Sequence, residues 1–215
     1  MKALLLAVLL SPASAAGLPA IGCTPVAAEW LKKEDFAAPS GAGASVPKLA
    51  KDPGVTWDLG EKRNASLGVY LTRECALGVR TRVTGGFESS SPDPRNAVEN
   101  LAGQLGRHAP DWTFSVTPPN TLALSRDGVA HTTDLRKLLQ IRLDAGTDVV
   151  LGGVPVRAVF DGWLLFLVPP DASKAVNLSV RSTLHPWAVY DLAAAGLGRL
   201  AVRYDEDKAV LYPLP

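Results

Sequence analysis

The chain has 215 residues, with 22 lysines and arginines against 21 acidic residues and a formal net charge of +1. This balance excludes the basic surface that binding to nucleic acid or to an anionic membrane requires, so we expect no nucleic-acid partner. Hydrophobic residues make up 47% of the sequence, which excludes a chain that is disordered throughout.

Residues 1–15 have the three parts of a secretory signal peptide. Lys2 supplies the positive start, Ala3–Leu10 is an unbroken apolar run, and Ser11–Pro12 breaks it before the small residues Ala13–Ala15. That run is too short to cross a membrane as a helix, and no later apolar run approaches the ~20 residues that a span needs. We therefore expect an exported protein of a bacterial periplasm or cell envelope, without a transmembrane segment in the mature chain.

The two cysteines allow two interpretations. In an oxidising compartment Cys23 and Cys75 are expected to form one disulfide, which would close a loop of about 50 residues and stabilise the fold by about 4 kcal/mol. Alternatively, Ala20–Cys23 resembles the lipobox of a bacterial lipoprotein, in which Cys23 carries a lipid anchor and Cys75 stays a lone thiol. The sequence does not decide between the two.

Residues 16–54 are predicted to hold a short N-terminal helix and a linker. The spacing of the apolar residues around Trp30 indicates a helix over 25–37, with Pro25 in its first turn. Residues 38–54 are rich in Ala, Pro, Gly and Ser, which is typical of a linker.

Residues 55–90 are predicted to be a strand-rich region. Three segments favour extended structure: Val55–Leu59, Leu67–Glu74 and Leu77–Thr84. Within the last segment Arg80 and Arg82 share one face and the apolar residues share the other, as expected of a sheet with one solvated side.

Residues 91–215 are predicted to repeat one order of elements, a helix followed by strands. In the first unit Asp93 caps a helix that Pro94 opens. The apolar stripe of this helix comprises Val98, Leu101, Ala102 and Leu105. Two strands follow, Trp112–Val116 and Thr121–Ser125.

The second unit begins with a cap signal at Thr132–Asp134. The apolar stripe of its helix comprises Leu135, Leu138, Leu139 and Leu143. The strands expected after it are Asp148–Leu151, Val154–Phe160 and Trp163–Val168. Asp161–Gly162 predicts a two-residue hairpin turn that places Phe160 opposite Trp163.

The strand Trp163–Val168 hardly alternates between apolar and polar residues, so we expect it to be central and covered on both faces. One cover is the helix of the second unit. The other is a neighbouring module or a partner protein, and a partner surface is therefore predicted at Trp163, Leu165 and Leu167. The residues expected in the core are Leu101, Leu105, Leu135, Leu138, Leu139, Val159, Leu165, Leu167 and Leu192.

The third unit has a strand at Ala175–Arg181 and a helix that His185–Pro186 opens. The apolar side of this helix comprises Val189, Leu192, Ala193 and Leu197. Leu200–Tyr204 and Ala209–Tyr212 are expected to pair across an acidic turn. The fold class is therefore predicted as α+β, with small helix-on-sheet modules after a strand-rich N-terminal region.

The order strand–helix–strand–strand resembles the periplasmic N-terminal modules of secretins and related STN-type domains. Ala175–Pro213 carries the likeness, with an alternating strand, a polar helix start, a helix ending at Gly196, and the strand Leu200–Tyr204. Modules of that family form rings or dock to envelope partners. The resemblance therefore implies an accessory protein of a secretin or pilus-like assembly rather than the channel itself.

No catalytic, cofactor or metal site is predicted. His131 and His185 stand at expected helix starts and His108 at a helix end, where capping or the helix dipole explains them. The three histidines make no ligand spacing with the cysteines. Asp205–Asp207 is a charged hairpin turn without the ligand register of a calcium-binding loop.

The sequence thus favours a non-enzymatic exported protein that binds another envelope protein as an interaction or assembly module. Two alternatives stay open. A secreted hydrolase would place a histidine beside a carboxylate in a deep pocket, and a carrier of a small apolar ligand would contain a large apolar cavity. Neither the partner, nor a ligand, nor the oligomeric state can be named from the sequence.

Overall fold

The computed structural model describes residues 21–117, 121–179 and 184–215. The predicted signal peptide lies outside these residues. The described part is mostly β, with 17 strands in four sheets and two α-helices. The predicted α+β class, built of repeated helix-on-sheet modules, is therefore wrong.

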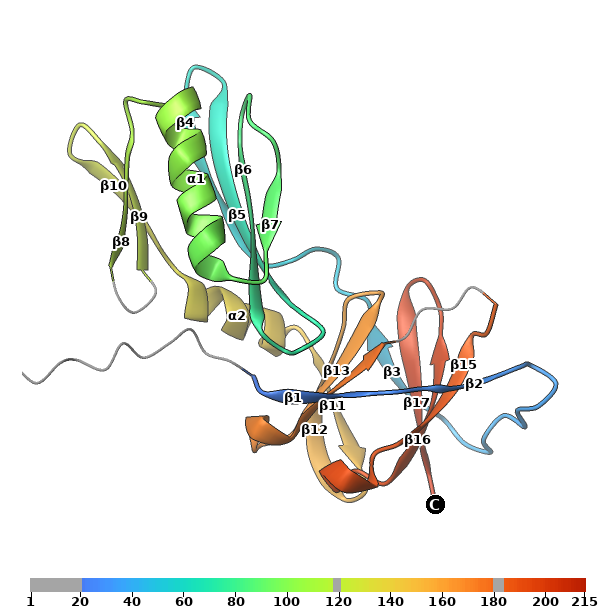
Figure 1. Cartoon of the computed structure of the whole chain (residues 1–215). Helices are drawn as coiled ribbons and strands as arrows, with labels where there is room; N and C mark the ends of the chain where they lie inside the picture. The colour runs from blue at the N-terminus through green and yellow to red at the C-terminus, as the bar shows by residue number, and fades with distance from the viewer. Residues whose placement is uncertain (1–20, 118–120, 180–183) are drawn as a thin grey trace, which may run out of the picture.

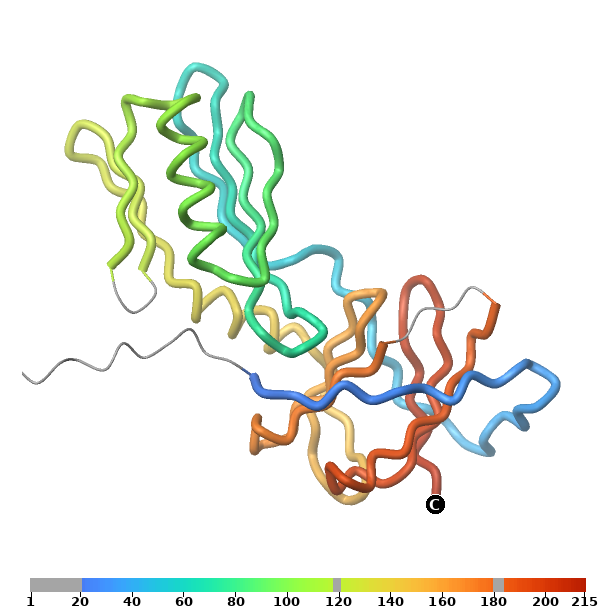
Figure 2. The backbone as a smooth tube through the Cα atoms, in the orientation of Figure 1, coloured from blue at the N-terminus to red at the C-terminus, as the bar shows by residue number. Residues whose placement is uncertain are grey.

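One domain, called here the sandwich, consists of two five-stranded sheets. The first sheet has the order β1 (Cys23–Val26), β14 (Ala175–Ser179), β13 (Leu164–Val168), β12 (Val154–Phe160) and β11 (Thr147–Leu151). The second has the order β2 (Glu29–Leu31), β15 (Trp187–Asp191), β16 (Arg199–Tyr204), β17 (Lys208–Leu214) and β3 (Ala44–Pro47). β1 runs parallel to β14, and the N-terminal chain of β1 and β2 passes along both sheets (Figure 2). Two short 3-10 helices, η1 (Ala172–Lys174) and η2 (Ala193–Ala195), complete the domain.

The other domain is inserted between β3 and β11 and is called here the inserted domain (Figure 1). Its four-stranded antiparallel sheet has the order β4 (Gly54–Gly60), β5 (Arg63–Leu71), β6 (Leu77–Val83) and β7 (Ser89–Ser91). Helix α1 (Pro94–His108) covers one face of this sheet. A three-stranded sheet follows with β8 (Thr113–Thr117), β9 (Thr121–Arg126) and β10 (Val129–Asp134), and α2 (Leu135–Asp144) leads back to the sandwich.

Both α-helices begin at the caps that the sequence predicts. The Asp93 carboxylate accepts a hydrogen bond from the Arg95 N–H at 2.9 Å, and Pro94 occupies the first turn of α1. The Asp134 carboxylate accepts one from the Arg136 N–H at 2.9 Å at the start of α2. An acceptor at this position satisfies a helix N–H that has no partner within the helix.

The two domains share one hydrophobic core. Leu101 and Leu105 of α1 and Leu138 of α2 belong to the same buried cluster as Val159 and Phe166 of the sandwich. A second cluster fills the space between the two sheets of the sandwich. All the predicted core residues are buried, with exposures between 0% and 8%.

Strand β13 confirms the expectation of a central strand covered on both faces. It is the middle strand of its sheet. Leu165 and Leu167 point into the core between the two sheets of the sandwich, whereas Phe166 faces the core shared with the inserted domain. Because both covers come from this chain, neither face of β13 requires a partner protein.

Two predicted helices are strands. The helix over 25–37 is replaced by β1 and β2, and the helix after Pro186 is replaced by β15. β2 pairs with β15 over Glu29–Leu31, so each strand obtains its hydrogen bonds from a segment far away in the sequence. Ala188 and Tyr190 are buried while their neighbours are not, which is the period of two expected of a strand. Ala175–Pro213, which carried the likeness to secretin modules, holds β14 to β17 and no α-helix among its described residues.

The turn between β12 and β13 is longer than predicted. Phe160 pairs with Leu165, not with Trp163. The Asp161 carboxylate accepts hydrogen bonds from the N–H groups of Trp163 and Leu164, at 2.8 and 2.7 Å. These bonds hold Asp161 to Trp163 as a loop before β13 begins at Leu164, and they leave Trp163 outside the sheet.

The predicted disulfide is confirmed, with the Cα atoms of Cys23 and Cys75 5.4 Å apart. It joins β1 of the sandwich to the loop between β5 and β6 of the inserted domain. In that loop the Arg73 carbonyl accepts a hydrogen bond from the Asn177 side chain on β14. The Cys23 sulfur is therefore part of a cross-link between the domains rather than the site of a lipid anchor. Among the described residues no helix is long and apolar enough to cross a membrane.

Candidate functional site

A cleft of about 640 Å³ lies where the two domains meet. One wall is the segment 48–56, which leaves the sandwich and enters the inserted domain. The floor is the face of β5 and β6 that α1 does not cover, and the opposite rim is the β12–β13 loop with Asp161 and Trp163. We call this the interdomain cleft. Its walls come from both domains, so its shape depends on how they are held together.

The floor combines small residues with one flat aromatic ring. Gly68 and Ser66 of β5 face the cleft. The ring of Tyr70 lies directly over Gly78, where a Cβ atom would come within 2.3 Å of the ring. The guanidinium of Arg80 lies over the same ring, 5.5 Å from its centroid. The alternation of β6, with Arg80 and Arg82 on the solvated face, agrees with the sequence prediction.

A buried arginine fixes the base of the cleft. Arg142 of α2 is 0% exposed and makes ion pairs with Asp52 of the wall and Asp161 of the rim, the latter at 3.5 Å. A buried charge is tolerated only when it is paired in this way. Arg142 was not predicted to be buried, although it follows Leu138 and Leu139 at the helical spacing that predicts burial.

The cleft carries more unpaired positive than negative charge. Asp52 and Asp161 are held by Arg142, and the remaining carboxylate, Glu88, lies 3.6 Å from Arg80. The lining also contains three cations for which the described residues provide no ion pair: Lys48, Lys51 and Arg82. The electrostatics of the cleft therefore favour an anionic ligand.

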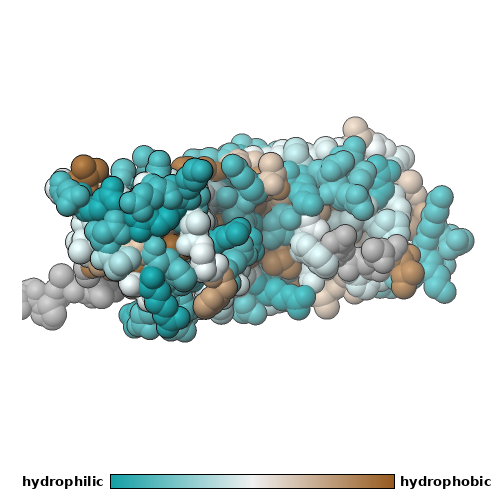
Figure 3. Space-filling model, turned by 90° about the horizontal axis from the view of Figure 1, so that it is seen from above, coloured by the Kyte–Doolittle hydropathy of each residue, from teal (hydrophilic) through white to brown (hydrophobic). Residues whose placement is uncertain are grey.

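The predicted partner surface is only partly exposed. Trp163 is 59% exposed at the rim of the cleft, whereas Leu165 and Leu167 are 0% exposed inside the sandwich. From above, the molecule is mostly hydrophilic, with hydrophobic residues scattered over it (Figure 3). Trp163 is thus an exposed aromatic side chain beside a charged cleft rather than part of an apolar face.

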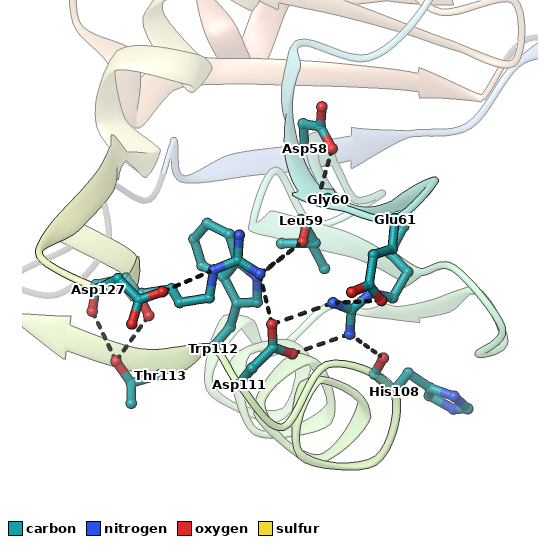
Figure 4. A network of polar contacts seen from close by, with 12 residues as sticks. Asp58, Leu59, Gly60, Glu61, His108, Asp111, Trp112, Thr113 and Asp127 are labelled. Carbon is teal, nitrogen blue, oxygen red and sulfur yellow. Dashed lines mark hydrogen bonds and ion pairs between the residues drawn. The ribbon is translucent and has the colours of Figure 1, made fainter.

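A second polar cluster lies at the far end of the inserted domain (Figure 4). Arg63 donates to both oxygens of Asp111 at 3.0 and 3.2 Å, and Arg126 donates to one of them at 2.7 Å. The hydrogen bonds from Arg63 and then from Arg126 lower the pKa of Asp111 to about 2. Trp112 donates to the Leu59 carbonyl at 3.2 Å, while Arg126 lies over its ring. Arg63, Asp111 and Arg126 are thus all paired, and the cluster ties the α1–β8 loop, β9 and the β4–β5 turn together.

The histidines and the acidic turn do not form a site with one another. His131 stacks on Trp112 with ring centroids 5.9 Å apart, and none of the three histidines lines the cleft. Asp205–Asp207 forms the turn between β16 and β17. Among the described residues no group of three His, Cys, Asp or Glu side chains could hold a metal ion.

Comparisons with known proteins return no match. No protein-family model, no curated protein and no solved structure matches the chain.

Proposed function

We propose that this chain is an exported, non-enzymatic protein of the cell envelope that acts as an interaction module and binds its partner in the interdomain cleft. The observation that supports this most is the composition of the cleft, where unpaired cations from the wall and floor face the exposed Trp163 at the rim. Aromatic and arginine side chains are enriched where proteins bind one another. The signal-peptide pattern and the disulfide support a periplasmic or envelope location.

The lining supports this proposal better than the two alternatives. Charged and small polar side chains suit a polar partner rather than the small apolar ligand of a carrier. Two of the three carboxylates in the lining pair with the buried Arg142, and the lining contains no histidine, so the described residues do not form the pair of a histidine and a carboxylate that a hydrolase would use.

Two glycine substitutions provide a matched test. Gly68 lies on the floor, and a Cβ atom there would make only ordinary contacts, the nearest at 3.7 Å to the Pro53 carbonyl. Gly103 lies on the exposed side of α1 with nothing within 4 Å of a Cβ atom. Gly68→Trp should fill the cleft, while Gly103→Trp adds the same side chain elsewhere.

The measurement is cross-linking of tagged full-length protein in envelope fractions of the producing cell. We expect a defined partner that is recovered with the wild type and with Gly103→Trp, and that is lost with Gly68→Trp. Recovery of no partner, or of a partner that Gly68→Trp does not affect, would contradict the proposal. Circular dichroism of both variants checks that the fold is unchanged.

A further inference from the structure

We infer that the cleft binds an extended polypeptide segment in which acidic side chains occupy every second position. The inference rests on the proposed function and specifies the chemistry of the partner. It is carried by the placement of Arg80 and Arg82 on the floor of the cleft, together with the excess of cations over carboxylates in its lining.

The spacing of the two arginines determines the spacing of the acidic side chains in the proposed ligand. Arg80 and Arg82 are two residues apart on the same face of β6, which separates their Cα atoms by roughly 6.6 Å in a strand. An extended segment lying along β6 repeats its side chains on one face with the same period. Carboxylates at every second position can therefore meet both guanidinium groups at once. Arginine is also the cation best suited to hold a carboxylate with two hydrogen bonds.

The cations are available to a ligand. Arg82 has no ion pair among the described residues, and Arg80 contacts Asp52 and Glu88 only at 3.5 and 3.6 Å. Arg80 is 48% exposed, so these contacts are weak and an incoming carboxylate can replace Glu88. Lys48 and Lys51 on the wall add positive charge from the other side.

The floor and rim suit a polypeptide backbone. Gly68 and Ser66 pair with Arg80 and Arg82 across β5 and β6, so the surface beside each arginine is flat and a backbone can approach it closely. Trp163 stands 59% exposed at the rim, where it can cover an apolar or aromatic side chain on the other face of the segment.

The test measures fluorescence anisotropy of two labelled peptides with the disulfide-bonded full-length protein. In the first peptide Glu alternates with Thr, and in the second the same residues are arranged with all Glu contiguous. We expect tighter binding of the alternating peptide, with an affinity that falls as salt rises. Arg80→Gln and Arg82→Gln should each weaken it about tenfold, the effect of losing one good charge-assisted contact.

Arg107→Gln is the matched control, because Arg107 is exposed on α1, away from the cleft. It should leave the affinity unchanged. The double variant Arg80→Glu with Arg82→Glu should abolish binding of the alternating Glu peptide and create binding of a peptide in which Lys replaces Glu. That gain cannot come from a variant that merely fails to fold.

Each of the following results would overturn the inference. Equal affinity for the two peptides would refute the alternation, and equal weakening by Arg107→Gln would refute the site. Stronger binding of an acidic polysaccharide, such as polygalacturonate, would show that the cleft takes a glycan. Loss of the envelope partner in Gly68→Trp, combined with no binding of either peptide, would overturn this inference alone. A partner that Gly68→Trp does not affect would overturn the proposed function as well.

Discussion

The inserted domain and the sandwich are assembled from the chain in opposite ways. In the inserted domain the strands that pair follow one another in the sequence, from β4 to β7 and from β8 to β10. In the sandwich β1, β2 and β3 pair with β14, β15 and β17, so residues 23–47 meet residues 175–214. Closing such distant pairs costs more conformational entropy and slows folding. The inserted domain can therefore form from local contacts, while the sandwich closes only after its two ends meet.

The shared core limits how far the two domains differ in stability. Leu138 of α2 packs in the same cluster as Phe166 of the sandwich, and the disulfide joins the domains at a second place. We therefore expect one cooperative unfolding transition, although the domains differ in how they form.

Removal of the disulfide should have the largest effect on this coupling. Replacing Cys23 and Cys75 by Ser should lower the free energy of unfolding by about 4 kcal/mol, because the bridge no longer constrains the unfolded chain. Urea unfolding followed by circular dichroism measures the change. A reductant should destabilise the wild type by a similar amount and leave the double variant unaffected. A loss below about 1 kcal/mol would show that the bridge adds little to the coupling.

Core truncations compare the two domains directly. Leu101→Ala in the inserted domain and Leu200→Ala in the sandwich each empty a fully buried site and should cost about 3 kcal/mol. Leu138→Ala, between the domains, should cost a similar amount, within about 2–5 kcal/mol. Calorimetry should show one transition that shifts in all three variants. Two transitions, of which Leu101→Ala moves only one, would show that the domains unfold independently. Val150→Ala, at a 64% exposed position, is the control.

Loss of Arg142 should weaken the contact between the wall and rim of the cleft. Arg142→Met removes the cation that pairs with Asp52 and Asp161 and should cost about 2 kcal/mol, less than a fully buried pair because both carboxylates keep some solvent. Adding Asp52→Asn and Asp161→Asn to Arg142→Met should recover part of this loss. No recovery in the triple variant would mean that packing of the arginine stem, rather than charge, accounts for the effect.

Alkaline pH should lower the stability of the sandwich. Tyr190 and Tyr204 share a hydrogen bond of 2.6 Å, and burial raises the pKa of both well above the ordinary value of 10. Their hydroxyls stay neutral in the folded state but ionise in the unfolded chain above pH 10, so stability should fall as pH rises beyond that point. Tyr204→Phe should melt with a weaker pH dependence between about pH 10 and 11 than the wild type. An unchanged slope would show that this pair does not cause the alkaline loss.

Acid pH should lower the stability of the inserted domain, by a smaller amount. The pKa of Asp111 is lowered to about 2 from the ordinary 3.8, so its carboxylate stabilises the fold above pH 4 and loses this effect as pH falls toward 2. The difference in Tm between the wild type and Asp111→Asn should therefore shrink between pH 4 and pH 2. A difference that is constant over this range would mean that the ion pairs with Arg63 and Arg126 contribute little.

The sequence predicted most elements of the inserted domain because their signals are local. Asp93 with Pro94, and Asp134 with the leucines after it, mark both helix starts without any knowledge of distant residues. The sandwich was harder because its edge strands are defined by distant partners. Trp30 and Val189 fit a helical stripe locally, yet β2 and β15 pair with each other. Long-range pairing of this kind overrides local propensity.

The cleft could be predicted only in part. The alternation of β6 placed Arg80 and Arg82 on the solvated face, but no local pattern shows that residues 48–56 and Asp161 face them. Asp161–Gly162 suggested a two-residue turn, and the extra hydrogen bonds of the Asp161 carboxylate lengthen it and expose Trp163. Arg142 was not among the predicted core residues, because a charged side chain is rarely fully buried, although its spacing from Leu138 and Leu139 places it on the buried side of α2.

The disulfide also makes residues 23–75 a closed covalent ring. This ring contains the loop between β2 and β3, the wall of the interdomain cleft, and β4 with β5. A protease that cuts the backbone once inside the ring, for instance in the exposed β2–β3 loop near Ser40, releases no fragment, because the disulfide still joins the two pieces. On a non-reducing gel the nicked molecule would still migrate as a single chain, and only a reductant would separate the pieces. In a protease-rich compartment, such a protein can be cut once in this ring and still keep both sides of the interdomain cleft.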